Sequence, residues 1–170
     1  MSIVSDESQW KQLSFLESIT NSESLSQENT ELEEVGQTPT SPHYIGQAGE
    51  HLVCYLFHMW QYNILQPLNP KSSYDLVVER DNKFKTIQVK TTQNGRKVSL
   101  KKSIISYQGV RKFGVYKEGD YDYLCACKFP YVYVVPFSKI EATTGFSFSL
   151  YPQYKYDLND PKTYEYRPTI

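Results

Sequence analysis

The chain has 170 residues, 39% of them hydrophobic and 22% charged, with a net charge of −1, which suits one globular domain of ordinary size. No apolar run approaches the ~20 residues of a membrane span, and the N-terminus lacks the basic and apolar regions of a secretory signal. Three cysteines, an odd number, do not make a disulfide framework. Collagen-like, coiled-coil, membrane and secreted disulfide-rich classes are therefore excluded, and a cytoplasmic protein without a membrane partner is expected.

The first 42 residues form an acidic segment rich in Ser, Glu, Gln, Asn and Thr. It holds eight acids and one lysine, a net charge of −7, so the rest of the chain carries +6. Apart from a short apolar patch between Trp10 and Leu16, it offers little to bury, and we expect it to be mostly disordered. It is either a solubilising tail or an arm that competes with a polyanion for a basic surface elsewhere. Residues 43–170 are expected to form the folded domain.

After this segment, a helix is predicted from Gly46 to Trp60, because apolar residues recur there at helical spacing. Four runs bounded by turn residues predict strands at Tyr62–Leu68, Asp75–Arg80, Phe84–Thr91 and Lys97–Lys101. Asp81 and Asn82 predict a tight turn between the second and third of these strands.

The second half of the chain begins with a polar, basic stretch that reaches Gly119 and has no clear periodicity. Tyr121–Lys128 and Tyr131–Phe137 then predict a hairpin, in which Cys125 and Cys127 point into the core. From Gly145 onward the sequence is aromatic and irregular. One helix followed by strands predicts an α+β domain.

The hairpin around Asp81 and Asn82 brings three polar residues to one face. A two-residue turn places Asp75 opposite Gln88, and a slip of two residues would place it opposite Lys90. Because strand side chains alternate, Asp75, Gln88 and Lys90 share a face in either register, and the other face is mainly apolar.

An acid, an amide and a lysine on one face suit metal-assisted phosphoryl chemistry. Mg²⁺ prefers oxygen ligands, of which Asp75 supplies a carboxylate and Gln88 a carbonyl. Lys90 can stabilise charge on a phosphoryl group or orient the attacking water. Glu50, near the start of the predicted helix, could complete the metal shell. The alternative is a solvent-facing sheet surface with an incidental Asp–Lys pair.

Three motifs in this order resemble the PD-(D/E)XK nuclease superfamily: Gly46-Gln47-Ala48-Gly49-Glu50, Tyr74-Asp75-Leu76-Val77-Val78 and Ile87-Gln88-Val89-Lys90-Thr91. The likeness is strongest to the small branch that includes Holliday-junction resolvases and a group I intron homing endonuclease, and it covers about residues 44–137. It implies a restriction-endonuclease-like α/β core within the α+β domain. In that core a central mixed β-sheet is joined by a helix that carries Glu50 and by a hairpin that carries Asp75, Gln88 and Lys90.

The resemblance also implies the role of each site residue. Asp75 is the central metal ligand, Gln88 the second ligand, and the backbone carbonyl of Val89 joins the shell. Glu50 is an accessory acid that binds metal or water, and Lys90 is the catalytic lysine. The implied cofactor is Mg²⁺, with Mn²⁺ as an alternative.

Two departures from the family pattern concern the metal site. Gln88 stands where an acid is commoner, and a neutral ligand should weaken Mg²⁺ binding, although active members of the branch carry the same residue. Ser73 and Tyr74 stand where a proline would precede the aspartate.

Residues 82–117 hold ten Lys and Arg and no acid. Basic residues interleaved with aromatic ones suit a DNA backbone, because each neutralised phosphate releases counterions. The residues expected to contact DNA are Lys97, Lys101, Lys102, Arg111, Lys112 and Lys117, interleaved with Tyr107, Phe113 and Tyr116. The alternative is an ordinary solvated loop.

These observations together predict a Mg²⁺-dependent endodeoxyribonuclease that cuts double-stranded DNA. Site-specific cutting, of the homing or restriction type, is the first expectation, and a homodimer or homotetramer would bring two sites to two strands. A structure-selective resolvase or repair nuclease is one alternative. A catalytically inactive DNA-binding module of the same fold is the other.

Overall fold

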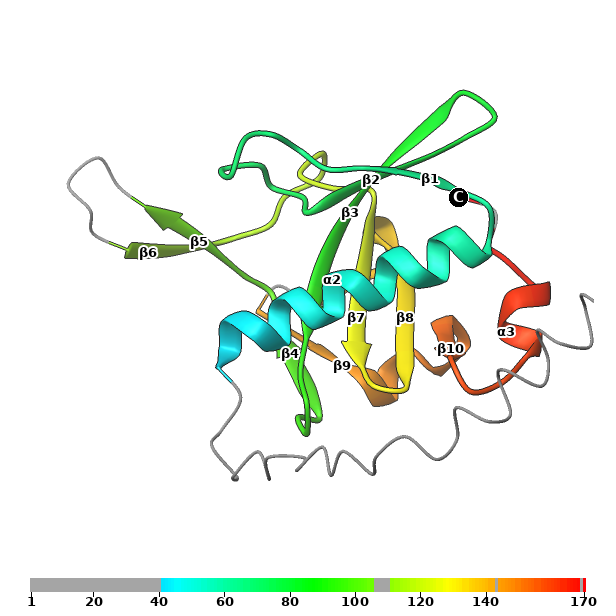
Figure 1. Cartoon of the computed structure of the whole chain (residues 1–170). Helices are drawn as coiled ribbons and strands as arrows, with labels where there is room; N and C mark the ends of the chain where they lie inside the picture. Colours follow the sequence, from blue (N-terminus) through cyan, green and yellow to red (C-terminus); the bar gives the residue numbers. More distant parts are fainter. Residues whose placement is uncertain (1–40, 106–110, 143, 169) are drawn as a thin grey trace, which may run out of the picture. The chain divides into compact units, whose positions relative to one another are not determined.

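The computed structural model describes residues 41–105, 111–142, 144–168 and 170 (Figure 1). The acidic segment 1–42, predicted to be mostly disordered, lies outside the described residues except for its last two. Tyr107 lies outside them too. Among the described residues, none of the helices combines the length and apolar character that a membrane crossing requires.

Helix α2 (Pro42–Met59) begins four residues earlier than the prediction from Gly46. The backbone N–H of His43 donates to Ser41 Oγ at 3.4 Å, so Ser41 caps the helix. Pro42 occupies the first turn, where a missing N–H costs nothing. A segment that reads as a turn in sequence is therefore a helix start. The end near Trp60 is as predicted.

A six-stranded sheet has the order β1-β2-β3-β7-β8-β10. Its strands are β1 (Asn63–Leu65), β2 (Leu76–Arg80), β3 (Lys83–Thr91), β7 (Tyr123–Lys128), β8 (Tyr131–Pro136) and β10 (Lys155–Asp157). β3 and β7 run parallel and the other neighbours run antiparallel, so the sheet is mixed, as predicted. β1 is shorter than the predicted Tyr62–Leu68, because Pro67 has no N–H to donate to a ladder.

The basic stretch after β3 is not irregular, which corrects the prediction. β5 (Lys101–Ile105) pairs with β6 (Arg111–Val115) in a hairpin that projects away from the sheet (Figure 1). Phe113 and Val115 are both exposed, so the described residues of β6 show no buried face whose periodicity would have identified the strand.

Short elements complete the domain. β4 (Lys97–Ser99) ends before the predicted Lys101 and pairs with β9 (Gly145–Ser147) in the C-terminal region. Three 3-10 turns and a short helix follow β8 at Phe137–Lys139, Phe148–Leu150, Pro152–Tyr154 and α3 (Lys162–Glu165).

Apolar side chains fill both faces of the sheet. α2 lies across one face, where Val53, Leu56 and Phe57 pack into a cluster with the fully buried Cys125 and Cys127, as predicted for both cysteines (Figure 1). A second cluster is built from residues of β4, β7, β8, β9 and the C-terminal turns, together with Leu100 after β4 and Tyr121 before β7: Val98, Leu100, Tyr121, Leu124, Ala126, Tyr133, Val135, Phe146, Phe148 and Tyr151.

Gly49 packs tightly against β3, because a methyl group there would overlap the Thr91 side chain. We therefore expect Gly49→Ala to lower the free energy of unfolding by about 1–3 kcal/mol. Gly46→Ala is the matched control, since nothing lies within 4 Å of its added Cβ. This control should raise stability by about 0.5–1 kcal/mol, because alanine is the better helix former. Urea unfolding compares the two variants, and equal midpoints would contradict this packing.

Candidate active site

The register of the β2–β3 hairpin places Asp75 opposite Gln88, as the two-residue turn predicted. Leu76 pairs with Ile87, and Asp81 and Asn82 both have positive φ, which is the geometry of a tight hairpin turn. Asp75 itself lies just before β2 rather than within it, which corrects the predicted strand start. Its N–H still donates to Ile87 O at 2.8 Å, so its side chain stays in the hairpin's alternation.

Asp75, Gln88 and Val89 form one polar cluster. Asp75 Oδ2 accepts hydrogen bonds from the Val89 N–H at 2.7 Å and from Gln88 Nε2. The same Nε2 also donates to Val89 O at 3.1 Å. Gln88 is only 3% exposed, so a solvent-facing sheet surface is the wrong interpretation of this face. Two oxygens, from Asp75 and Val89, thus converge on one side-chain amide.

The chemistry of this cluster fits a hard divalent cation. An amide presents Nε2 or Oε1 after a half-turn, so Gln88 can also direct an oxygen toward the carboxylate and the carbonyl. Carboxylate, amide and backbone oxygens are ligands that Mg²⁺ accepts. Among the described residues, no group of three or more His, Cys, Asp or Glu side chains is arranged to hold a metal ion. The candidate set differs from such arrangements because it depends on an amide and a main-chain carbonyl.

Glu50 lies near this cluster. The close packing of Gly49 on β3 sets the next residue, Glu50, at a cavity of about 220 Å³ that Asp75 also lines. The remaining wall comes from the loop between β1 and β2: Gln66, Pro67, Asn69, Pro70, Ser72 and Tyr74. Burial, and then the charge of Asp75, raise the pKa of Glu50. The structure therefore brings together the two carboxylates that the sequence had suggested.

Lys90 completes the group from β3. Burial lowers the pKa of its ammonium, and the charges of Asp75 and Glu50 oppose that shift. Burial also raises the pKa of Asp75, against hydrogen bonding from Val89 and the charge of Lys90. The four side chains proposed from sequence thus lie within electrostatic reach of one another.

Tyr116 is a further residue of the site, which the sequence identified only as an aromatic in the basic run. Its ring centroid lies 5.6 Å from Lys90 Nζ and 5.7 Å from Lys102 Nζ. Burial, followed by the charges of Asp75 and Asp120, raises the pKa of Tyr116 to about 12. Tyr116 directly follows β6, a strand that the sequence pattern did not predict, so hydrophobic periodicity could not place Tyr116 at the site. The ring joins the hairpin to the face of β3 that carries Gln88 and Lys90.

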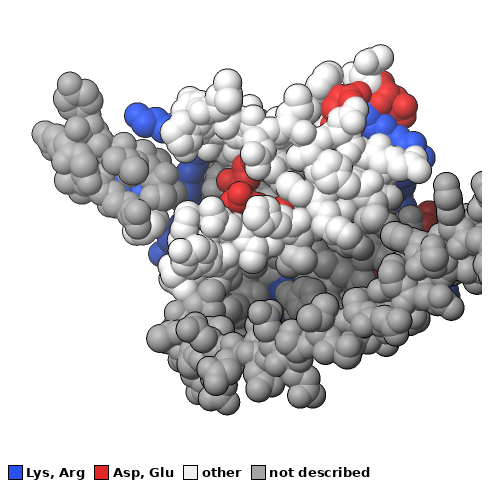
Figure 2. Space-filling view, in the orientation of Figure 1, with Lys and Arg blue, Asp and Glu red and all other residues white. Residues whose placement is uncertain are grey.

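The basic residues fall into different groups. Lys97, Lys101, Lys112 and Lys117 are exposed, and Lys101 Nζ lies 5.9 Å from the Phe113 ring. The backbone of Arg111 pairs with Ile105, and its side chain lies outside what the structure describes. Figure 2 shows acidic atoms near the centre of this face, with atoms of Lys and Arg beside them toward the hairpin.

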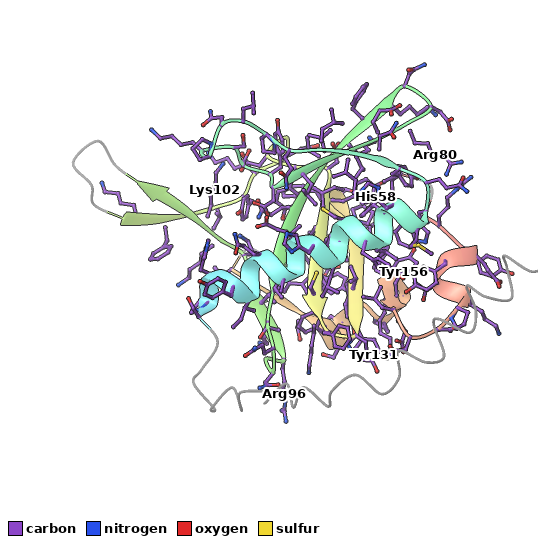
Figure 3. The ribbon with its side chains drawn as sticks, viewed as in Figure 1. His58, Arg80, Arg96, Lys102, Tyr131 and Tyr156 are labelled. Atoms are coloured by element: carbon purple, nitrogen blue, oxygen red, sulfur yellow. The ribbon has the colours of Figure 1, made fainter. Side chains whose placement is uncertain are left out.

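Lys102 differs from the other lysines, because its Nζ lies 2.9 Å from Asp120 Oδ1. Figure 3 shows Lys102 beside the β5–β6 hairpin. Asp120 O also accepts from Ser73 Oγ at 2.9 Å, which ties this pair to the loop before Asp75. The predicted acid-free run is therefore partly neutralised by an acid that follows it in the chain.

Known proteins resemble the chain over the region that contains this site. A model of the PD-(D/E)XK endonuclease family matches residues 40–151. Protein 5.3 of Escherichia phage T7 is 30% identical over 103 residues, which are 61% of this chain and 86% of that protein. The structure of a bacterial homing endonuclease, I-Ssp6803I, gives a TM-score of 0.51 at 21% identity, covering 64% of this chain and 78% of that one. At this identity the likeness concerns the fold alone.

Proposed function

The chain belongs to the PD-(D/E)XK endonuclease family, and we propose that it is a Mg²⁺- or Mn²⁺-dependent endonuclease of double-stranded DNA. The observation that carries the proposal is the convergence of Asp75 Oδ2 and Val89 O on the Gln88 side chain. Lys90 is the next residue on the same face of β3 and supports the assignment.

Each residue has a role that follows from its position. Asp75, Gln88 and the Val89 carbonyl would hold the metal, with Glu50 at the edge of the shell. A bound divalent ion supplies Lewis-acid chemistry: it polarises the phosphate and lowers the pKa of water. The Lys90 ammonium stabilises the charge that develops on the phosphate oxygens. Glu50, whose pKa is raised by burial, is suited to orient the water and accept its proton.

Site-specific cutting, as by a homing or restriction enzyme, is the specificity we propose. The likeness of the fold to I-Ssp6803I, a bacterial homing endonuclease, supports this proposal. A homodimer or homotetramer is the proposed assembly, since one site of this kind cuts one strand. A structure-selective resolvase is the alternative, and substrate choice separates the two.

The test is cleavage of supercoiled plasmid, linear duplex and a four-way junction, each with Mg²⁺, Mn²⁺ or EDTA. We expect cutting with either metal and none in EDTA, because the candidate ligands are hard oxygens. Discrete fragments from plasmid and linear duplex would support site-specific cutting, whereas cleavage confined to the junction would support a resolvase. Nicking that persists in excess chelator would contradict the metal site. Binding without cleavage under every condition would identify an inactive DNA-binding module.

The Tyr116 ring is expected to hold the Lys90 ammonium in place. Tyr116→Leu should therefore slow cleavage about tenfold at saturating DNA, because a cation–π contact contributes about 1–2 kcal/mol. Tyr116→Phe keeps the ring and should retain the wild-type rate. Single-turnover cleavage with thermal unfolding of both variants measures this. Equal rates for Leu and Phe variants of equal stability would show that the ring does not act on Lys90.

A further inference from the structure

The face of the β2–β3 hairpin that lies under α2 changes from apolar to basic where the helix ends. Leu76, Val78 and Ile87 are buried there. By alternation, the next residues on this face are Arg80 on β2 and Lys83 and Lys85 on β3. The hairpin thus reaches beyond the helix with three cations on one face.

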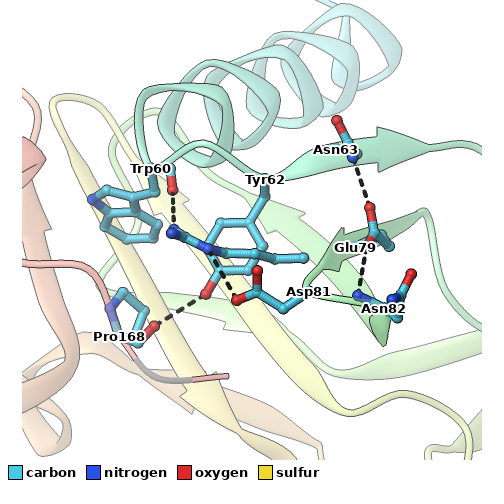
Figure 4. Close-up of polar contacts among 8 residues, drawn as sticks. Trp60, Tyr62, Asn63, Glu79, Asp81, Asn82 and Pro168 are labelled. Carbon is cyan, nitrogen blue, oxygen red and sulfur yellow. Dashed lines mark hydrogen bonds and ion pairs between the residues drawn. The ribbon is translucent and has the colours of Figure 1, made fainter.

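The C-terminal segment closes this basic end into a cavity of about 220 Å³. Tyr62 Oη donates to Pro168 O at 3.3 Å and so links the helix end to that segment (Figure 4). The polar and charged residues of the wall are Tyr62, Arg80, Asp81, Lys83, Lys85 and Arg167. The volume is several times the ~30 Å³ that one water occupies in the liquid, which leaves room for a small hydrated anion.

Arg80 is held in a fixed orientation at this cavity. Its Nη1 donates to Trp60 O at 3.0 Å, and its Nε lies 3.5 Å from Asp81 Oδ2. Its Cζ lies 5.6 Å from the Tyr62 ring centroid. A guanidinium has five N–H groups, and these contacts engage two of them. The others lack a partner in the described part of the chain, and Arg80 lines the cavity, so these donors are available to an anion that binds there.

Positive charge is in excess around the cavity. Lys83 and Arg167 are exposed and form no ion pair with any residue that the structure describes. Lys85 Nζ lies 3.7 Å from Asp122 Oδ1. The neighbouring acid Glu79 lies on the opposite face, where Asn63 Nδ2 and the Asn82 N–H donate to its oxygens at 2.6 and 2.9 Å (Figure 4). Asp81 is the acidic side chain that lines the wall, and the main-chain carboxylate of Ile170, the last residue of the sequence, is the other negative group there, so the four cations of the wall still outnumber the anions.

We propose that this cavity is a second phosphate site, which binds a backbone phosphate of DNA away from the candidate active site. A phosphate group offers several acceptor oxygens, which match the remaining guanidinium donors and the two unpaired cations. The proposal rests on the proposed function only for its choice of DNA as the source of the phosphate. Free inorganic phosphate has the same chemistry and is distinguished by the experiment.

The cavity lies toward the other end of the hairpin from the candidate active site and on its other face, because Asp75 and Arg80 are an odd number of residues apart along the strand. Asp75 and Arg80 lie at opposite ends of the hairpin, five residues or about 17 Å apart at ~3.3 Å per strand residue. Figure 3 likewise places Arg80 beyond the end of α2, well apart from Lys102. Adjacent phosphates of one strand are ~3.4 Å apart along a duplex axis. The cavity would therefore bind a different phosphate from the one that is cut.

The experiment compares two double variants of the full chain. Lys83→Gln with Arg167→Gln removes two exposed cations of the cavity, and Lys139→Gln with Lys162→Gln removes two exposed cations outside it. Fluorescence anisotropy of a duplex oligonucleotide, in EDTA and over a range of salt, gives the log–log slope of DNA affinity. We expect the cavity variant to lose about 0.9 from the magnitude of this slope, the share of one phosphate contact, and the control to keep the wild-type slope.

Identical slopes for the two double variants would overturn the proposal. A calorimetric result could also overturn it. If inorganic phosphate bound the wild type but not the cavity variant, while the two proteins had the same salt slope for DNA, the site would bind free phosphate and not DNA. Since binding is measured in EDTA, a protein that never cleaves DNA would refute the proposed function and leave this test intact. Single-turnover cleavage at saturating DNA should be the same in the Lys139→Gln, Lys162→Gln control as in the wild type.

Discussion

Replacing Asp75 by asparagine is expected to reduce DNA cleavage by about a thousandfold while the protein remains folded. The change removes the negative charge that would hold a divalent cation, which supplies several kcal/mol of charge stabilisation. It preserves the local hydrogen bonds, because the Val89 N–H and Gln88 Nε2 both donate to the same oxygen, Oδ2. An asparagine carbonyl can occupy that position. Single-turnover cleavage of plasmid in Mg²⁺ measures the loss.

Stability separates a catalytic role for Asp75 from a structural one. Burial raises the pKa of Asp75 in the folded protein, so its contribution to stability is lost as pH rises through that pKa. At neutral pH the neutral asparagine variant should therefore melt, in EDTA, at the wild-type temperature or above it. Glu141→Gln removes the same charge at an exposed position and should change neither property. Cleavage by the Asp75 variant at the wild-type rate would show that the hairpin has been misassigned.

The parts of the site that could be predicted from sequence are those set by local rules. Asp81 and Asn82 both adopt the positive φ that a two-residue turn requires, and this alone fixes Asp75 opposite Gln88. Alternation then places Lys90 on the same face. The helix that carries Glu50 follows from its apolar period. Its earlier start at Pro42 was missed because a serine cap followed by proline looks like a turn in sequence.

The parts that could not be predicted depend on contacts between distant segments. Asp120 lies just beyond the acid-free run, and the fold returns it to Lys102 at 2.9 Å. Gln88 is buried because β3 pairs in parallel with β7, a strand more than thirty residues later in the chain. Tyr116 directly follows β6, and its ring lies 5.6 Å from Lys90 Nζ, a residue of β3 that is 26 positions earlier in the chain. Charge counts and periodicity carry no information about such contacts.

Replacing Lys90 by methionine is expected to slow cleavage at saturating DNA by about 10²- to 10³-fold, comparable to the loss of one oxyanion-stabilising donor. Methionine retains an unbranched apolar chain of similar length, so packing is preserved. Because burial lowers the pKa of Lys90, its ammonium destabilises the folded state below that pKa, and the neutral variant should be at least as stable at neutral pH. Single-turnover cleavage and thermal unfolding measure the two effects.

Lys102→Met is the matched control, since the two ammonium groups lie 5.6 and 5.7 Å from the same Tyr116 ring and each variant removes one positive charge. Lys102 is on the hairpin and pairs with Asp120. Its loss should weaken DNA binding and lower the magnitude of the salt slope by up to about 0.9. The cleavage rate at saturating DNA should stay within about threefold of the wild-type rate. Lys90→Met should show the reverse, a slower cleavage rate with nearly unchanged DNA affinity in EDTA.

If both variants lost cleavage rate equally, Lys90 would have no special part in catalysis. If both lost only affinity, the two lysines would form one DNA-binding surface across Tyr116, and charge stabilisation in the reaction would have to come from another group.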